Sequence, residues 1–208
     1  MNLLEKRREL LIAKKVPPSE YQQVEFIEST GTQWIDTGII PSATSKLEAT
    51  AQFTVDYSGI EANYLCGITG GTGRLAFGYA GTQSKTLFSV MIGGKNFKGL
   101  VYFDTAKRIF SISGDGYVRV GDVSDKYDVS EFTGQYTIPI FAARRSTGIA
   151  YYSSMKLFNY KLYDGEILLR DFIPCYRKSD NEIGLYDLVT KTFYTNQGTG
   201  EFLKGEEV

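Results

Sequence analysis

The chain has 208 residues, a net charge of −1 and an apolar content of 42%. This balance excludes an intrinsically disordered chain and argues against a nucleic-acid binder, which usually carries a strongly basic surface. Tyr, Phe and Gly are frequent, with 15, 13 and 22 residues, whereas Pro contributes only 5. Such a composition favours short strands joined by tight turns.

Residues 1–18 form the first expected unit, a short α-helix. Asn2 can cap its start with Glu5 three residues later, and Pro17 and Pro18 end it. Cations within its apolar stripe disfavour a self-contained coiled coil, so we expect the helix to dock on another surface or to oligomerise. Alternatively it packs on its own domain, with the cations reaching water. The stripe consists of Leu3, Leu4, Arg7, Leu10, Leu11 and Lys14.

From Tyr21 onward the hydrophobic period changes from helical to two, which predicts one all-β domain over residues 19–208. Residues 45–54 show the clearest alternation, and Asp164-Gly165 is a two-residue hairpin signal. Regular short strands without βαβ alternation indicate a sandwich or barrel. Further strands are expected at residues 64–68, 75–79, 86–92, 100–103, 108–113, 117–120, 137–142, 155–163, 166–173, 183–188 and 192–195.

The scarcity of histidine and cysteine excludes several kinds of catalytic and metal-binding site. The chain has no histidine, which removes Ser-His-Asp and Cys-His catalysis in their usual forms and the commonest zinc sites. Cys66 and Cys175 are expected to be buried thiols, with a disulfide as the alternative. The charged N-terminus lacks the apolar core of a signal peptide, and no run reaches the length of a membrane span. We therefore expect synthesis in a cytoplasm and no membrane insertion.

Acidic residues offer two kinds of site. A glycosidase needs two carboxyl groups facing each other, and no strand carries two acids at matching steps. Aspartates in turn-rich sequence either form a calcium loop or are solvated turn residues. We expect no enzyme and no obligatory cofactor, with calcium left open. These aspartates are Asp115, Asp122, Asp125 and Asp128.

Aromatic side chains beside polar ones are the candidate glycan-binding residues, because sugars stack on aromatic faces while polar groups hold their hydroxyls. The alternative for each ring is packing in the core. Tyr151 and Tyr152, if they lie in a strand, must face opposite sides. The candidates are Trp34 and Asp36 in one group, and Arg144, Arg145, Tyr151 and Tyr152 in another.

Both ends of the expected domain carry distinctive segments. They read YQQVEFIESTGTQWIDTG at residues 21–38, LRDFIPCYR at 169–177, IGLYD at 183–187 and FYTN at 193–196. Together they resemble laminin-G-like, concanavalin-type jelly-roll modules of phage and prophage virion proteins from Gram-positive gut bacteria, over roughly residues 19–205. The resemblance implies a two-sheet antiparallel jelly-roll sandwich that often binds glycans or host surfaces. It supplies no catalytic residues.

The resemblance and the basic helix together predict a phage virion surface protein, such as a head fibre, a capsid decoration protein or a tail appendage. The helix would dock to a capsid or tail protein and support a homo-oligomer, with a trimer favoured. The sandwich would touch host surface polysaccharide, weakly and in many copies. The alternatives are a bacterial carbohydrate-binding adhesion module, a glycoside hydrolase, and a purely structural decoration protein without ligand.

Overall fold

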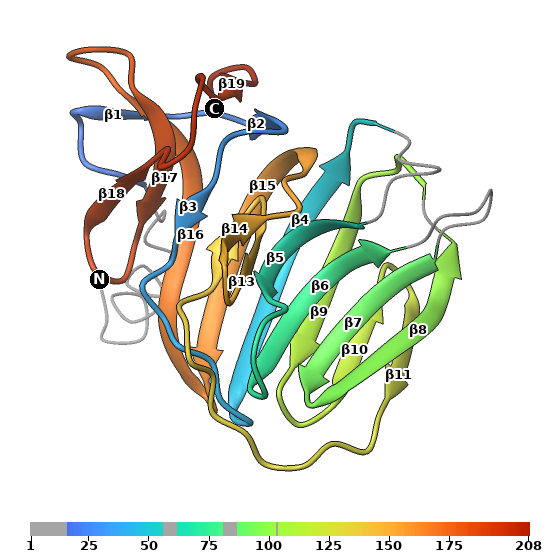
Figure 1. The fold of residues 1–208 in the computed structure, drawn as a ribbon. Helices are drawn as coiled ribbons and strands as arrows, with labels where there is room; N and C mark the ends of the chain where they lie inside the picture. Colours follow the sequence, from blue (N-terminus) through green and yellow to red (C-terminus); the bar gives the residue numbers. More distant parts are fainter. Residues whose placement is uncertain (1–15, 56–61, 81–86, 103) are drawn as a thin grey trace, which may run out of the picture.

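The structure, a computed structural model, describes residues 16–55, 62–80, 87–102 and 104–208 (Figure 1). The regular elements of these residues are all strands, which confirms the all-β prediction. They include no helix long and apolar enough to cross a membrane. Residues 1–15 of the predicted N-terminal helix lie outside the described residues. All of its expected docking residues belong to this part, namely Leu3, Leu4, Arg7, Leu10, Leu11 and Lys14.

The larger of two sheets has the strand order β11-β10-β9-β4-β15-β16-β17-β18, with every neighbouring pair antiparallel. These strands are β11 (Val123–Lys126), β10 (Tyr117–Val120), β9 (Arg108–Ser113), β4 (Ser45–Phe53), β15 (Ser154–Asp164), β16 (Ile167–Arg177), β17 (Ile183–Asp187) and β18 (Thr192–Thr195). Three short strands attach to β16, β15 and β2 respectively, namely β1 (Tyr21–Gln23), β2 (Ile27–Thr30) and β19 (Leu203–Lys204).

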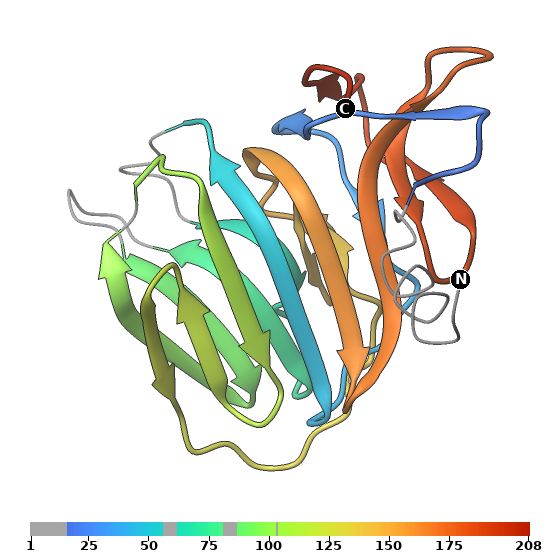
Figure 2. The same cartoon turned by 180° about the vertical axis from the view of Figure 1, so that it is seen from behind.

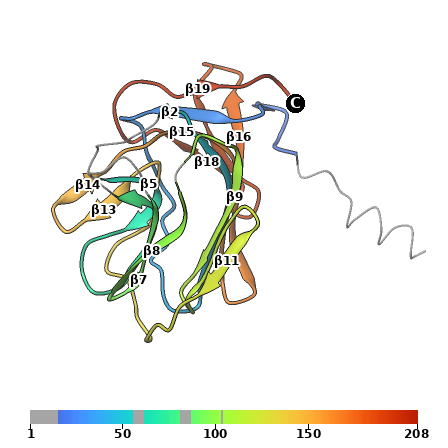
Figure 3. The same cartoon turned by 90° about the vertical axis from the view of Figure 1, so that its right-hand side faces the viewer.

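The smaller sheet packs against the larger one, and Figure 3 shows the two layers edge-on. Its order is β14-β13-β5-β6-β7-β8, in which only the β13–β5 pair is parallel among the described residues. The strands are β14 (Gly148–Ala150), β13 (Ala143–Arg145), β5 (Ala62–Ile68), β6 (Arg74–Ala80), β7 (Leu87–Gly93) and β8 (Lys95–Tyr102). The strands β12 (Pro139–Ile140) and β3 (Ile35–Asp36) pair with each other, and β12 also pairs with β5.

Aromatic rings between the sheets hold the two layers together. The Phe110 ring of β9 lies 5.2 Å from that of Phe77 and 5.4 Å from that of Phe88, which belong to the opposite sheet. Phe53 of β4 meets Phe110 edge-on at 6.3 Å. All four side chains are buried. Since each fully buried Phe contributes about 1.5–3 kcal/mol to folding, this cluster is a major source of stability.

The two cysteines lie in different sheets, Cys66 in β5 and Cys175 in β16, and both are free and buried. The disulfide alternative is therefore wrong, and the expectation of buried thiols is confirmed. Burial raises the pKa of each thiol to about 12, because an apolar environment disfavours the thiolate.

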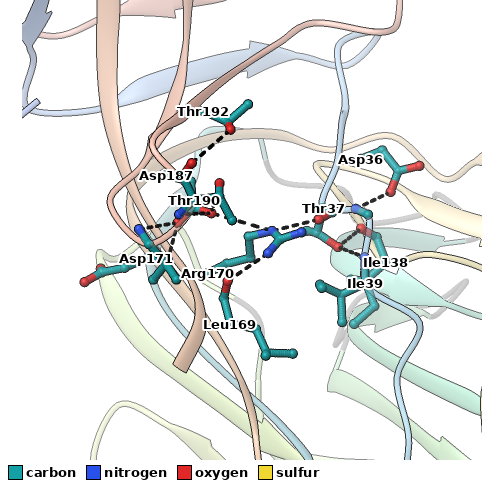
Figure 4. Close-up of polar contacts among 12 residues, drawn as sticks. Asp36, Thr37, Ile39, Ile138, Leu169, Arg170, Asp171, Asp187, Thr190 and Thr192 are labelled. Atoms are coloured by element: carbon teal, nitrogen blue, oxygen red, sulfur yellow. Dashed lines mark hydrogen bonds and ion pairs between the residues drawn. The ribbon is translucent and has the colours of Figure 1, made fainter. Parts of the chain in front are cut away.

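Arg170 and Asp187, which lie in the distinctive segments near the end of the chain, form a structural anchor (Figure 4). Asp187 is 0% exposed, and its carboxylate accepts hydrogen bonds from the Asp171 amide at 2.9 Å and the Thr190 hydroxyl at 2.6 Å. Arg170 Nε lies 3.6 Å from Asp187 Oδ2 and donates to the Thr37 carbonyl at 3.0 Å. The pair thus ties β16 to the β17–β18 turn and to the segment after β3.

Some predicted boundaries are wrong. The strand expected over residues 137–142 shrinks to Pro139–Ile140, because Phe141 has a φ of 69° and leaves the extended region. Asp164 pairs with Ile167, so the hairpin loop is Gly165-Glu166 and lies one residue later than predicted. The short strands β1, β2, β3, β11, β13, β14 and β19 have no counterpart in the prediction.

Candidate functional site

A groove of about 550 Å³ lies on the outward face of the large sheet. Its floor comes from β10, β9, β4, β15 and β16, the neighbouring strands that face the viewer in Figure 2. Polar and charged side chains make up most of its lining. The lining residues are Lys46, Glu48, Ala49, Thr50, Ile109, Ser111, Tyr117, Arg119, Asn159, Lys161, Asp171, Ile173 and Leu188.

The alternation of side chains along β4 explains why this face is polar. Leu47, Ala49 and Ala51 are buried between the sheets, whereas Glu48 and Thr50 point outward and are half-buried. In a strand successive side chains take opposite faces, so one pattern supplies both the core and the groove floor. The prediction of a two-faced strand over residues 45–54 is confirmed.

A β-bulge adds a further outward side chain in β15. The register with β4 shifts between Leu157 and Asn159, so Phe158 and Asn159 both escape burial, while Leu157 and Tyr160 on either side are buried. Asn159 then exchanges two hydrogen bonds with Thr50, at 3.2 Å to its amide and 3.1 Å to its hydroxyl. The bulge keeps Asn159 and Lys161 on the groove side of the sheet.

One row of directly paired residues runs across the whole floor. Its members come from five strands and carry alternating chemistry. With neighbouring strands about 4.8 Å apart, the row spans roughly 19 Å from end to end. In order across the sheet they are Arg119, Ser111, Glu48, Lys161 and Asp171.

Two side chains, Lys46 and Tyr163, contact the Glu48 carboxylate from the side of the row that is nearer the start of β4. Lys46 Nζ lies 2.8 Å from its carboxylate, and the Tyr163 hydroxyl donates to it at 3.5 Å. The hydrogen bond to Glu48 raises the pKa of Lys46, and burial followed by the Glu48 charge raises the pKa of Tyr163. Glu48 is therefore a positioned, already neutralised acceptor on the groove floor.

Two floor groups have no partner among the described residues. The Ser111 hydroxyl oxygen is buried and makes no hydrogen bond, although the side chain lines the groove. Lys161, half-buried beside Glu48 and Asp171 in the row, makes neither a hydrogen bond nor an ion pair within the described part of the chain. Unpaired polar groups of this kind favour occupation by a polar ligand or by water.

The two ends of the groove differ. At the β10 end stand Tyr117 and Arg119, whose Nε donates to the Gly121 carbonyl at 2.6 Å. At the β16 end the lining becomes apolar with Ile173 and Leu188. An aromatic face, a row of hydrogen-bonding groups and an apolar end match the usual composition of a small-molecule or sugar site.

An acidic pair does line this groove, contrary to the expectation drawn from the strands taken singly. Glu48 and Asp171 lie in one row, two strands apart, with Lys161 paired to both. Inverting glycosidases hold their carboxyl groups about 6.5–9.5 Å apart with room for the glycosidic bond and a water between them. In this row the Lys161 side chain stands between the two acids, where a hydrolase needs open space.

The sequence-predicted residues Trp34 and Asp36 lie outside the groove. Trp34 is half-buried, and its amide donates to Asn196 Oδ1 at 3.2 Å. Asp36 accepts hydrogen bonds from the Gly38 amide at 2.9 Å and the Thr137 hydroxyl at 2.8 Å. Both carboxylate oxygens of Asp36 are thus engaged in fixing the chain around β3.

The second predicted group lies at the β13–β14 end of the small sheet, and it is partly brought together. The Arg145 guanidinium lies 5.3 Å from the centre of the Tyr151 ring, while Arg144 lies 5.3 Å from that of Tyr136. Tyr151 and Tyr152 follow β14 in a non-strand segment, so the argument from strand alternation does not apply to them. None of the predicted residues lines the groove.

The aspartates considered for calcium have other partners. Asp115 accepts hydrogen bonds from the Ser113 hydroxyl and the Lys126 ammonium, which lower its pKa, with Lys126 the larger cause. Asp122 lies 4.0 Å from Arg119, and Asp128 lies 4.0 Å from Lys95. Over the described ranges, no three Cys, Asp or Glu side chains gather in a way that could hold a metal ion.

Comparison with known proteins places the fold. No protein-family model matches the chain, and no curated protein does. The chain is similar to a crystal structure of a Bacteroides ovatus protein proposed to bind carbohydrate, with a TM-score of 0.57 and 12% identity. The match covers 89% of this chain but 62% of that one, so the chain spans less than two thirds of it.

A heptameric SAP-like pentraxin from Limulus polyphemus is also similar, with a TM-score of 0.44 and 9% identity over 69% of this chain and 75% of that one. At such identities the likeness to the Bacteroides structure bears on the fold alone. It agrees with the predicted jelly-roll sandwich of two sheets.

Proposed function

We propose that this domain binds carbohydrate, without catalysis, in the groove on the large sheet. The observation that carries the proposal is the row from Arg119 to Asp171, which lines an open groove with donors and acceptors at strand spacing. Sugar hydroxyls pair well with carboxylates, amides and hydroxyls, and Tyr117 offers a ring at one end. The fold likeness to a protein proposed to bind carbohydrate adds support.

Binding of the purified chain to a panel of neutral and acidic oligosaccharides, measured by calorimetry, tests the proposal. Tyr117→Ala and Glu48→Gln should each weaken binding by roughly tenfold, the effect of about 1.4 kcal/mol. Lys156→Gln is the matched control, because Lys156 lies outside the groove with its ammonium 4.3 Å from the Phe26 ring. Absence of binding to every saccharide, or equal affinity in both groove variants, would exclude this site.

Glycoside hydrolysis is the second candidate, and only the Glu48–Asp171 pair favours it. The test is release of reducing ends from saccharides that bind the chain. We expect no turnover. Release that Glu48→Gln abolishes would replace the binding proposal with an enzyme.

The resemblance described above also predicts attachment to a phage particle through residues 1–16. The similar Bacteroides protein is proposed to bind carbohydrate, so carbohydrate binding comes first and the virion setting is a separate proposal. Its test is deletion of residues 1–16, followed by measurement of incorporation into particles. Unchanged incorporation would exclude this attachment, whatever the domain binds.

A further inference from the structure

The uncompensated charge of the groove floor is centred on Lys161. Lys46 is paired with Glu48 at 2.8 Å, so these two charges neutralise each other. Asp171 is 3% exposed and is not a free group either. Lys161 forms no direct ion pair within the described residues, although it is half-buried in the groove and stands between Glu48 and Asp171 in the row. A partly desolvated ammonium without a partner gains most from a ligand anion.

Arg119 strengthens the same positive bias at the β10 end. Its nearest described carboxylate, Asp122, lies 4.0 Å away with a fully exposed side chain, where water screens the attraction. The groove lining holds three cations, Lys46, Arg119 and Lys161, against two carboxylates. With Lys46 and Glu48 paired, Arg119 and Lys161 remain against Asp171, so the groove lining as a whole carries a net charge of +1.

The groups around Lys161 suit a polyhydroxyl ligand. Ser111 lies two strands away in the same row, roughly 10 Å between Cα atoms, and its buried hydroxyl has no partner in the described part of the chain. A sugar ring can bridge such a gap, with its carboxylate towards Lys161 and a ring hydroxyl towards Ser111. Glu48 lies between them as a fixed acceptor for further hydroxyls.

We propose that the groove prefers saccharides that carry a carboxylate, of the uronic acid class, and that Lys161 holds this carboxylate. This inference rests on the proposed carbohydrate binding and adds the chemical class of the ligand. An acidic peptide would satisfy Lys161 but would not use the hydroxyl-binding groups of the row.

The experiment compares oligosaccharides of galacturonate, glucuronate, mannuronate and guluronate with their carboxyl-reduced counterparts, which match them in length and linkage. Affinities of the full chain are measured by calorimetry at low and moderate salt. For at least one pair the acidic form should bind about tenfold more tightly, with a preference that shrinks as salt rises. Lys161→Gln should abolish this preference, whereas Lys156→Gln should keep it.

Three results would overturn the inference. The first is a reduced oligosaccharide that binds as tightly as its acidic form in every pair that binds, and the second is a preference that persists in Lys161→Gln. The third is poly-glutamate binding as tightly as the best uronate. In the first two cases saccharide binding itself still stands. If no saccharide binds in either form, the proposed function fails and this inference falls with it.

Discussion

Arg170 Nε and Asp187 Oδ2 lie 3.6 Å apart in an ion pair whose side chains are 15% and 0% exposed. Removing one partner of a buried pair leaves the other charge uncompensated, which typically costs about 3–5 kcal/mol. We therefore expect Asp187→Ala to lower the free energy of unfolding by about 3 kcal/mol, measured by urea denaturation. Asp180→Ala, which removes the partner of Arg177 in a surface pair, should leave the midpoint unchanged.

Alkaline pH should destabilise the domain because of its buried thiols. Burial raises the pKa of Cys66 and Cys175 from 9.0 to about 12, so above pH 9 the unfolded chain loses these protons while the folded chain keeps them. Stability therefore falls as pH rises between about 9 and 12. We expect a loss of roughly 4–5 kcal/mol between pH 9 and 11 in urea titrations, about 2 kcal/mol from each thiol. A Cys66→Ala and Cys175→Ala double variant should show a shallower fall, and an equal slope would contradict the assignment.

Ser111→Ala should separate binding from stability. The hydroxyl is buried and has no partner in the described residues, so its removal costs the folded chain no hydrogen bond and relieves a desolvated polar group. The thermal midpoint should stay the same or rise, while affinity for a groove ligand falls several-fold. A lowered midpoint with unchanged affinity would show that Ser111 serves the fold rather than the ligand.

The pair Arg145 and Tyr151 provides the opposite comparison. Both were candidate glycan-binding residues, yet they lie at the β13–β14 end of the small sheet, outside the groove. We expect Arg145→Ala and Tyr151→Ala to leave saccharide affinity unchanged in the same calorimetric assay. A loss of affinity in either variant that matches Tyr117→Ala would move the site to the small sheet.

The sequence was informative where structure depends on neighbouring residues. The alternation of Leu47 with Glu48 predicted both the strand and its two faces, and Asp164-Gly165 marked the hairpin between β15 and β16 to within one residue. Very short strands such as β3, with two residues, leave too few positions for a period to be detected.

The groove could not be predicted from the sequence because its residues are distant along the chain. Glu48, Ser111 and Lys161 become neighbours only through the register of β9, β4 and β15, which no local pattern specifies. Glu48 and Asp171 lie two strands apart in the sheet, so the spacing of acids within any single strand does not reveal this pair. The alternation along β4 placed Glu48 and Thr50 on one outward face, but it does not distinguish a groove floor from an ordinary solvated surface.

The alternation that builds the groove also separates two kinds of evolutionary constraint. Every floor position of β4 is flanked along the chain by side chains of the interior, so a substitution at Glu48 or Thr50 leaves Leu47, Ala49 and Ala51 in place. Ligand preference can consequently diversify one position at a time on an unchanged scaffold. Relatives of this domain should share their interior side chains while recognising different partners.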